Sequence, residues 1–237
     1  MGEGACASMN SSMDSNLQKI AVFDLDGTSI SRQSGHLFST YLFHHGYISK
    51  RNALKLYWWG VRYILHLPHS QEESRELIFS GLKKLPGTKV DEIMHDFHEE
   101  VIKKYYRRDA IAEVRKRQSE GYVCILVSAA FEGLAKQAAR FMGMDGYVAT
   151  RMEVDEQGNY TGRMLGKAVE GPQKPCAVRK WANEHFGEGR WVLECAYGDH
   201  YSDTALLSEA THGFAVRPKW VLRKNAEKYG FKILNWN

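Results

Sequence analysis

Short apolar runs that end in polar residues alternate along the chain with segments of helical periodicity. Runs of this length, bounded by glycine or polar residues, predict buried strands. These runs span residues 19–25, 122–127, 191–197 and 212–216. Amphipathic segments predict helices at 109–118, 132–142, 176–185 and 219–229. Strands and helices that alternate in this way predict an α/β fold with an open parallel sheet, which carries its active site at the carboxyl ends of its strands.

A long helical segment separates the first predicted strand from the second. Residues 33–106 keep helical periodicity, with a break at 68–70, over a length far above that of the usual crossover between neighbouring parallel strands. We therefore predict an inserted, all-helical cap domain at 33–106, placed over the carboxyl end of the first strand. The α/β core then comprises 18–32 and 107–237, and residues 1–17 are expected to form a disordered leader.

The segment 151–164 has a different pattern from its surroundings. Apolar and polar residues alternate there on both sides of Gln157-Gly158-Asn159. A glycine-containing turn between two alternating stretches predicts a β-hairpin, here a flap beside the sheet.

An aromatic stripe lies inside the predicted cap. Its residues are Tyr57, Trp58, Trp59 and Tyr63. The spacing of one helical face also links Leu54, Trp58, Val61 and Leu65. We interpret the rings as packing inside the cap, with an aromatic amphipathic helix that lies on a membrane surface as the alternative. The apolar stretch 53–67 is interrupted by charges and is too short to cross a bilayer.

Composition narrows the class of protein. Apolar residues make up 43% of the chain and charged residues 25%, which is typical of a globular protein and excludes a largely disordered chain. The net charge of +4 is spread without a long basic run, so we predict no nucleic-acid partner. No C-x-x-C pair occurs, and Cys124 and Cys195 lie inside apolar runs, as in proteins of a reducing compartment. Because the first residues lack a signal-peptide pattern, we expect a cytoplasmic protein.

The strongest candidate for chemistry is the sequence Asp24-Leu25-Asp26-Gly27-Thr28 at the end of the first predicted strand. Side chains alternate along a strand, so Asp24 and Asp26 can project from the same side while Leu25 turns away. Two carboxylates placed in this way can divide the work, one as nucleophile or metal ligand and the other as proton donor. Asp-Gly-Thr is also common in turns, which is the structural alternative.

Three further polar positions follow predicted strands or precede helices. Ser128 follows an apolar run, and a helix is expected to open at about Ala129, where backbone N–H groups can hold phosphate; alternatively, Ser128 only caps that helix. Lys174 lies in a predicted loop before a helix and can offset phosphoryl charge. Asp199 and Asp203 are four residues apart where a strand gives way to a helix, so both can face one hard cation such as Mg²⁺.

The order of these motifs resembles the haloacid dehalogenase-like (HAD) superfamily: D-x-D-G-T, a serine at the end of a strand, a lysine, and G-D-x-x-x-D. The long insert directly after the first motif is similar to the C1-capped branch, subfamily IB, which includes the phosphoserine phosphatases. The sequence Ser128-Ala-Ala-Phe131 also resembles the S-G-G-F of that branch. The resemblance covers the core nearly from end to end, and implies a Mg²⁺-dependent phosphomonoester hydrolase with a Rossmann-like core and a helical C1 cap.

The resemblance also implies a role for each motif residue. Asp24 would attack phosphorus and form an aspartyl-phosphate, while Asp26 would protonate the leaving oxygen and then activate the hydrolytic water. The implied phosphate-binding residues are Thr28, Ser128, Ala129 and Lys174. The implied Mg²⁺ ligands are Asp24, the backbone carbonyl of Asp26, Asp199 and Asp203. This assignment agrees with the general needs of phosphoryl transfer, which are positioning and charge stabilisation.

Departures from the family pattern limit the prediction of the substrate. Gln33 occupies the place of a glutamate that meets the ammonium group of phosphoserine in that branch, so phosphoserine is disfavoured, and a small phosphorylated metabolite is predicted instead. His200 stands where a serine is commoner. The residues that we expect to contact the leaving group are Arg32, Gln33, His36 and Arg62.

Two alternative functions remain open from the sequence. Phe38, Tyr41 and Leu42 give the start of the cap a spacing similar to that of type-C phosphatidylglycerophosphate phosphatases, which implies a lipid-phosphate phosphatase at the membrane surface. The other alternative is a catalytically silent phosphate-binding module. The presence of both aspartates of the first motif, together with Lys174 and Asp199, argues against a silent module.

Overall fold

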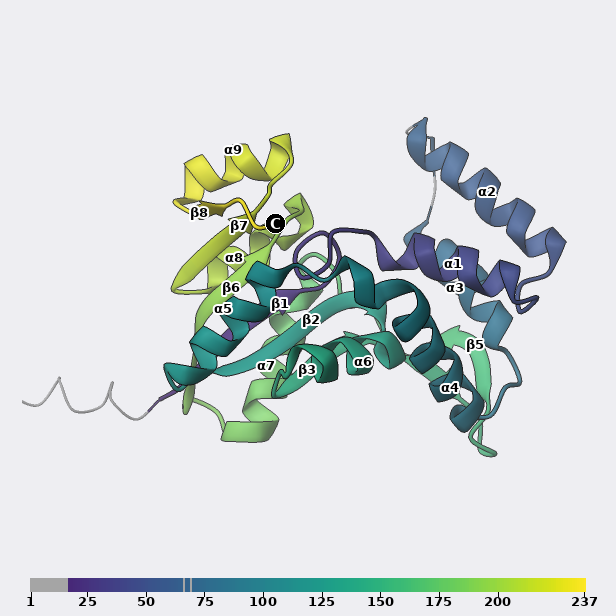
Figure 1. Cartoon of the computed structure of the whole chain (residues 1–237), viewed down its shortest axis with the longest axis horizontal. Coiled ribbons are helices and arrows are strands. Elements are labelled where there is room, and N and C mark those ends of the chain that lie inside the picture. The colour runs from purple at the N-terminus through teal and green to yellow at the C-terminus, as the bar shows by residue number, and fades with distance from the viewer. Residues whose placement is uncertain (1–16, 66, 69) are drawn as a thin grey trace, which may run out of the picture.

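The computed structural model describes residues 17–65, 67–68 and 70–237 (Figure 1). In this part of the chain six parallel strands form one sheet, in the order β3-β2-β1-β6-β7-β8. The strands are β1 (Gln18–Asp24), β2 (Val123–Phe131), β3 (Gly146–Thr150), β6 (Trp191–Gly198), β7 (His212–Val216) and β8 (Lys232–Leu234). The open α/β sheet predicted from the sequence is therefore confirmed. The predicted leader, except for Leu17, lies outside the described residues.

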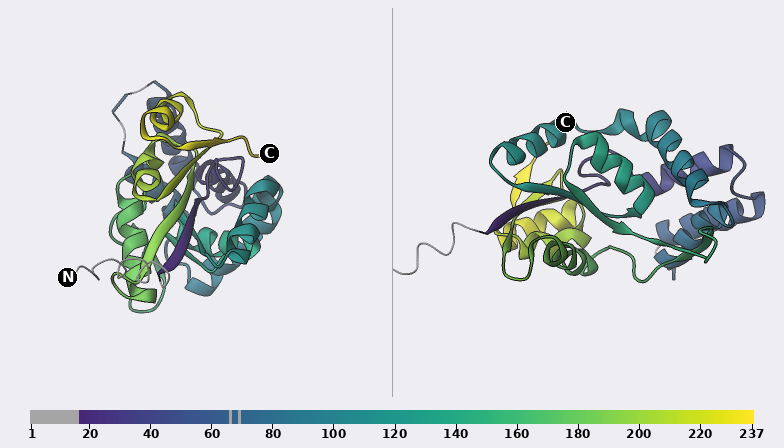
Figure 2. Two further views of the ribbon diagram at one scale, coloured as in Figure 1. Left: turned by 90° about the vertical axis from the view of Figure 1, so that its left-hand side faces the viewer. Right: turned by 90° about the horizontal axis from the view of Figure 1, so that it is seen from below.

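Helices cover both faces of the sheet (Figure 2). On β1, Ile20 and Val22 pack on one face, and Ala21 and Phe23 pack on the other. The first face is covered by α7 (Gln173–Phe186), α8 (Thr204–Glu209) and α9 (Trp220–Tyr229). The second is covered by α5 (Arg108–Ser119) and α6 (Glu132–Met142). A parallel strand buried on both faces explains why the apolar run of β1 is continuous rather than alternating.

The regular elements described between β1 and α5 are all helical. They are α1 (Ser34–His44), α2 (Lys50–Ile64), α3 (Gln71–Phe79), a 3-10 turn (Ser80–Leu82), α4 (Gly87–Phe97), a π-helical turn (His98–Ile102) and a second 3-10 turn (Lys103–Tyr105). Apolar residues of α1, α4 and α6 share one hydrophobic cluster, which includes Phe38, Phe97 and Leu134. These elements agree with the predicted helical insert, whose boundaries as a separate domain remain a prediction.

The predicted hairpin is present and packs against the cap. Strand β4 (Met152–Val154) pairs antiparallel with β5 (Tyr160–Met164). The Lys84 N–H donates to the Tyr160 carbonyl at 2.8 Å, and the Tyr160 N–H donates to the Leu85 carbonyl at 3.0 Å. An ion pair between Arg75 of α3 and Glu170, 2.5 Å apart, also connects the cap to the loop before α7. The hairpin is thus a support beneath the cap rather than a free flap.

The aromatic rings of α2 correct one sequence-based prediction. Tyr57 is 71% exposed and Trp58 is 57% exposed, so the interpretation that the rings pack inside the cap is wrong for these two. Trp59 is half-buried, and its Nε1 donates to the Ser70 carbonyl within the cap. Helix α2 instead turns Ala53 and Leu56 toward the hydrophobic cluster. The side chain of Tyr63 lies outside the described residues. Among the residues that the structure describes, no helix has both the length and the apolar character needed to span a membrane.

Candidate active site

The first and last acidic motifs meet because their strands are neighbours in register. Asp24 of β1 lies opposite Val127 of β2, and Phe23 lies opposite Tyr197 of β6. The residues that follow these pairs, Ser128 and Asp199, therefore emerge at the same sheet edge as Asp24. Carboxyl ends of adjacent parallel strands are where open α/β sheets place their ligands. Register alone brings together motifs more than 100 residues apart in sequence.

Lys174 joins two carboxylates of this edge. Its Nζ donates to Oδ1 of Asp24 and to Oδ1 of Asp203, each at 2.6 Å, and the side chain is 4% exposed. Burial alone would lower the pKa of Lys174, but the charges of Asp203 and Asp24 outweigh it and the pKa is raised. Lys174 is therefore a fixed cation. Its place corrects the predicted loop, because α7 begins at Gln173 and Lys174 lies in the first helical turn.

Asp24, Asp199 and Asp203 form a buried carboxylate cluster. Each has a carboxylate oxygen within 4.8 Å of one from the other two. Burial raises the pKa of Asp24 well above its usual range, and the charges of Asp203 and Asp199 add to the increase against the opposing effect of Lys174. Burial and then the charge of Asp203 raise the pKa of Asp199 to about 7. One lysine does not balance three carboxylates, so the cluster fits a hard divalent cation with oxygen ligands.

Gly27 makes room for this cluster. Its φ of +84° lies in the left-handed region, and a Cβ built on it would overlap the carboxylate of Asp199. The loop is held in place by Ser29, whose hydroxyl donates to the Asp24 carbonyl at 2.6 Å. Thr28 is buried, and its hydroxyl lies 3.4 Å from Oδ1 of Asp199. Only glycine allows both the turn after Asp26 and the close approach of Asp199.

The carboxylate of Asp26 points to the first helix of the cap. Its Oδ1 accepts from the backbone N–H of Ser34 at 2.7 Å, and its Oδ2 accepts from the Ser34 hydroxyl at 2.9 Å. Burial raises the pKa of Asp26, while both Ser34 hydrogen bonds lower it. The Asp26 carboxylate is thus separate from the cluster of Asp24, Asp199 and Asp203. The metal ligand predicted at Asp26 is its backbone carbonyl oxygen, not its carboxylate. The sequence analysis did not single out Ser34.

The strand that carries Ser128 and Ala129 is longer than predicted. Strand β2 continues through Phe131, and α6 begins at Glu132, so the helix expected to open at Ala129 starts three residues later and Ser128 does not cap it. The buried Ser128 hydroxyl accepts from the Ala130 N–H at 3.0 Å. The Ala129 carbonyl accepts from the Thr150 hydroxyl at 3.0 Å. Hydrogen bonds within the loop, rather than a helix N-terminus, therefore hold this segment.

The expected leaving-group residues separate into two groups. Arg32, Gln33 and His36 are exposed at the start of α1, beside the Asp26–Ser34 contact. Arg62 lies on α2, and its guanidinium binds Glu73 at 2.7 Å within the cap. The ion pair places Arg62 between α2 and α3, away from the carboxylate cluster (Figure 1). The first three residues thus flank Ser34, which contacts Asp26, whereas Arg62 is engaged within the cap.

The structure shows contacts of two residues near the site, Arg107 and His200, that the sequence did not predict. Arg107 donates to the Gly27 carbonyl at 3.4 Å and to the Trp236 carbonyl at 3.2 Å, so it connects the first motif to the end of the chain. The backbone N–H of His200 donates to Oδ2 of Asp203 at 3.1 Å, and its ring lies 2.9 Å from the Ser202 hydroxyl. Burial lowers the pKa of His200. His200 thus orients Asp203 through its backbone, a role that the sequence could not show.

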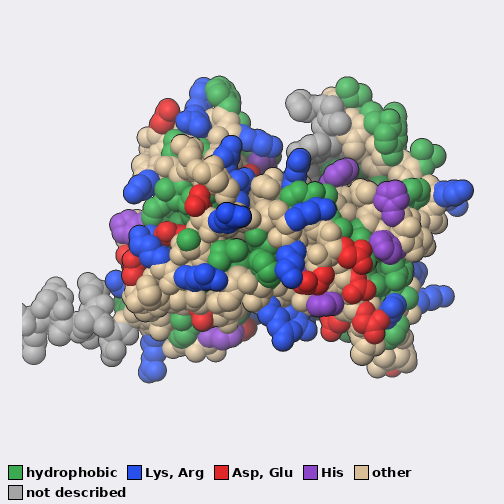
Figure 3. All heavy atoms as spheres, in the orientation of Figure 1, with side chains coloured by type: hydrophobic (Ala, Val, Ile, Leu, Met, Phe, Trp, Pro, Cys, Tyr) green, Lys and Arg blue, Asp and Glu red, His purple; other side chains and the backbone are tan. Residues whose placement is uncertain are grey.

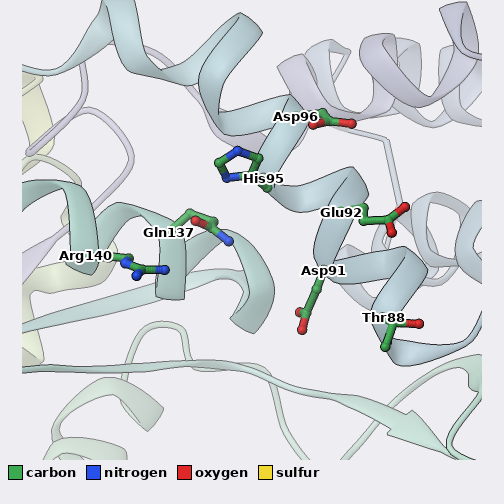
Figure 4. A pocket seen from close by; sticks show the side chains of 7 residues that line it. All are labelled: Thr88, Asp91, Glu92, His95, Asp96, Gln137 and Arg140. Carbon is green, nitrogen blue, oxygen red and sulfur yellow. The ribbon is translucent and has the colours of Figure 1, made fainter.

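A hollow lies elsewhere, between α4 and α6 (Figure 4). Its volume is about 590 Å³. It is lined by Thr88, Asp91, Glu92, His95, Asp96, Gln137 and Arg140. The carboxylates that line it would repel a phosphate group, and none of the motif residues reaches it. The carboxylate edge of the sheet is therefore the better candidate site.

Comparisons with known proteins agree with this geometry. The family model of haloacid dehalogenase-like hydrolases matches residues 21–208. The phosphoserine phosphatase SerB1 of Mycobacterium tuberculosis is 27% identical over 92% of this chain and 71% of its own length. A histidinol-phosphatase of Neisseria meningitidis is 23% identical over 93% of this chain and 100% of its own. A structure of a protein of unknown function from Bordetella pertussis has a TM-score of 0.81 at 24% identity, covering 92% and 99% of the two chains.

The open parallel sheet and the carboxylate–lysine edge define a phosphatase of the α/β class. The chain belongs to the haloacid dehalogenase-like hydrolases. It is a HAD-family phosphatase, so the alternative of a catalytically silent phosphate-binding module is set aside.

Proposed function

We propose that this phosphatase hydrolyses a small phosphorylated metabolite by a double displacement through an aspartyl-phosphate on Asp24. The observation that carries the proposal is the contact of Lys174 with both Asp24 and Asp203 in a buried site. A buried cation at a carboxylate nucleophile can balance the charge of an incoming phosphoryl group. Thr28, Ser128 and the loop at Ala129 are the proposed phosphate-binding residues, because they surround the same strand ends.

In the first step an oxygen of Asp24 attacks phosphorus. The new O–P bond forms as the bond between phosphorus and the leaving oxygen breaks, and the leaving oxygen takes the proton of Asp26. Burial raises the pKa of Asp26, which favours the protonated form that this step needs. Lys174 stabilises the negative charge that gathers on the transferred group.

In the second step water attacks the same phosphorus. Asp26, now deprotonated, takes a proton from the water while the bond from phosphorus to Asp24 breaks, and inorganic phosphate leaves. Asp26 is thereby protonated again and Asp24 is free, so the cycle closes. Because Ser34 binds both oxygens of Asp26, it can hold this carboxyl in one orientation through both steps.

The donor set fits Mg²⁺, which we propose as the cofactor. Asp24, Asp199 and Asp203, with the backbone carbonyl of Asp26, would hold it, because these are hard oxygen donors. Burial, and then the charge of Asp203, raise the pKa of Asp199. When bound, the ion would neutralise the carboxylates and polarise a phosphoryl oxygen. Nucleophilic attack, proton donation and proton uptake are all carried out by side chains of this protein.

The substrate is proposed to be a phosphomonoester other than phosphoserine. Gln33 is a neutral amide and is exposed at the start of α1, near Asp26 and Ser34. An amide does not balance an ammonium group. The relatives named phosphoserine phosphatase and histidinol-phosphatase support a small phosphomonoester as the substrate class. We also propose a cytoplasmic location, because Cys124 and Cys195 are buried free thiols.

A Mg²⁺-dependent assay with an aryl phosphate tests the proposal. Wild-type protein is expected to release phosphate, and Asp24→Asn is expected to lose the activity by at least about 1000-fold. A panel of L-phosphoserine, L-histidinol phosphate and other phosphomonoesters then ranks the substrates. Full activity of the Asp24→Asn variant would contradict the proposed nucleophile, and a clear preference for L-phosphoserine would contradict the interpretation of Gln33.

A lipid phosphate is the second candidate for the substrate. The specific observation in its favour is the exposure of Tyr57 and Trp58 on the cap. Phe38, Tyr41 and Leu42 do not add to it, because all three are buried in the hydrophobic cluster. Phosphate release from phosphatidylglycerophosphate in mixed micelles, measured beside the soluble panel, distinguishes the two candidates.

A further inference from the structure

Helix α2 carries an apolar face that the rest of the described chain leaves uncovered. Leu54 is 68% exposed and Leu65, just after the helix, is 61% exposed. With Tyr57 and Trp58 they recur at the spacing of a single helical face, and Val61 lies between them. In Figure 3, hydrophobic side chains gather on the part of the surface that α2 forms in Figure 1. We call these five residues the α2 outer face.

The opposite side of α2 accounts for its attachment to the protein. Ala53 and Leu56 pack against the hydrophobic cluster, and Asn52 donates to the Ser80 hydroxyl at 2.9 Å. Trp59 also turns inward, where its Nε1 donates to the Ser70 carbonyl at 2.7 Å. The folded chain therefore uses the inner side fully, and the outer face is not needed to hold α2 in place.

Basic residues border the α2 outer face. Lys50, Arg51 and Lys55 are exposed, and the helix contains no acidic residue. At 100° per residue, Lys50 falls between Tyr57 and Val61 within the apolar arc, and Arg51 and Lys55 lie beside its Trp58 edge. Glu72, Glu73 and Glu76 of the neighbouring α3 line the same hollow as Leu54 and Trp58. Of these, Glu73 is paired with Arg62. The face itself thus combines aromatic and aliphatic side chains with positive charge.

We propose that the α2 outer face docks the phosphatase on an anionic lipid bilayer surface. Helices with aromatic and leucine residues on one side and lysine or arginine at its borders lie in the interface of membranes, and anionic headgroups attract the basic border. A second copy of the chain is disfavoured as occupant, because two α2 faces would bring their basic borders together. The inference does not depend on the proposed substrate, because docking and hydrolysis use different residues.

Vesicle binding tests the docking surface directly. Full-length protein is mixed with vesicles of pure phosphatidylcholine, or with vesicles that contain 30% phosphatidylglycerol by design, and the bound fraction is measured by flotation. We expect binding to the anionic vesicles, weakened about ten-fold by Trp58→Ala. Reversal of two basic residues, Lys50→Glu with Arg51→Glu, is expected to weaken it about 25-fold, since each basic residue near an anionic surface contributes about five-fold.

The chain contains a matched control on another helix. Trp220 of α9 is 67% exposed, and Lys224 lies over its ring at 3.9 Å. Trp220→Ala and Lys224→Glu therefore remove an equally exposed aromatic ring and a basic charge outside the α2 outer face. Both are expected to leave vesicle binding unchanged, and soluble aryl phosphate hydrolysis is expected to be unchanged in the α2 variants.

Three outcomes would overturn the docking proposal. Absence of binding to anionic vesicles does so, as does equal weakening by Trp220→Ala and Trp58→Ala. A dimer in sedimentation velocity that Trp58→Ala dissociates would assign the face to a second copy instead. Loss of aryl phosphate hydrolysis with retained vesicle binding would affect only the proposed function, so the two failures are distinguishable.

Discussion

Ser34 binds both carboxylate oxygens of Asp26, one through its backbone N–H and one through its hydroxyl. Ser34 is the first residue of α1, so the first turn of the cap holds the proposed acid–base residue of the core. This contact connects the position of the cap to the orientation of the carboxyl that exchanges protons with the substrate. This contact between Asp26 and Ser34 arises from the fold and cannot be read from the sequence motif at residues 24–28.

The Ser34 hydroxyl is expected to affect turnover rather than substrate binding. Ser34→Ala should lower kcat about ten-fold with little change in KM, because one oriented hydrogen bond to Asp26 is lost. Since that bond lowers the pKa of Asp26, its removal should also move the alkaline limb of the kcat/KM profile to higher pH. Steady-state kinetics across pH measure both effects.

Ser39 provides the control for this prediction. It lies on the same helix, and its hydroxyl donates to the His36 carbonyl at 2.8 Å. Ser39→Ala should leave kcat and the pH profile unchanged, and Ser34→Thr should retain most of the activity. An effect of Ser39→Ala equal to that of Ser34→Ala would mean that α1 is only being destabilised.

Gly27 is expected to tolerate no side chain. In Gly27→Ala the new Cβ would occupy the position of the Asp199 carboxylate, so activity should fall at least about 100-fold through displacement of the metal-binding edge. Gly121 has almost the same φ, +83°, with no atom near the position of a Cβ. Gly121→Ala therefore introduces the same backbone strain without the overlap, and should keep activity within about two-fold. Equal losses in both variants would show that strain alone is responsible.

Lys174 is expected to be needed for stability as well as for turnover. Lys174→Met leaves Asp24 and Asp203 buried without their cation, so the free energy of unfolding should fall by about 3 kcal/mol. Added Mg²⁺ should recover part of this loss, because it supplies positive charge to the same carboxylates. Denaturant unfolding with and without Mg²⁺ measures both quantities.

Lys180 is the matched control on α7. It is exposed and lies 4.0 Å from Glu184, so Lys180→Met should change the unfolding free energy by no more than about 0.5 kcal/mol. If Lys174→Met is as stable as Lys180→Met without metal, the buried ion pairs do not have the assigned role.

The raised pKa of Asp199 predicts a pH-dependent stability. Because folding raises this pKa from its usual value near 4 to about 7, the native state holds a proton that the unfolded state has released between these values. The contribution of Asp199 is therefore present below about pH 4 and is lost as pH rises toward 7. Mg²⁺ competes with that proton, so its stabilising effect should be larger at pH 8 than at pH 6.

Thermal unfolding of the wild type and of Asp199→Asn, with and without Mg²⁺, isolates this contribution. The difference between the two proteins should carry the pH slope, and the variant should lose most of the Mg²⁺ effect. A Mg²⁺ effect that is the same at both pH values would contradict the role of Asp199.

The sequence was sufficient to predict that the acidic residues gather at the strand ends. Asp24 and Asp199 lie at the ends of apolar runs that form the neighbouring strands β1 and β6. Because these strands pair in parallel, both carboxylates lie at the same edge of the sheet. The contact of Ser34 with Asp26 could not be predicted in this way, because it depends on the direction in which α1 leaves the loop. Trp58 shows the same limit, since periodicity identifies a face but not which element covers it.

The proposed covalent intermediate on Asp24 can be trapped most directly by rapid acid quench of a single turnover. Borohydride reduces an acyl phosphate but not a free carboxylate, so mass spectrometry of the reduced digest locates the phosphorylated residue. We predict that borohydride reduces Asp24 when the quench is made during turnover. Without substrate, we predict no reduction at Asp24 in the wild type or in Asp26→Asn. Turnover that proceeds with no reducible residue, or with reduction at Asp26, Asp199 or Asp203 instead, would contradict the mechanism.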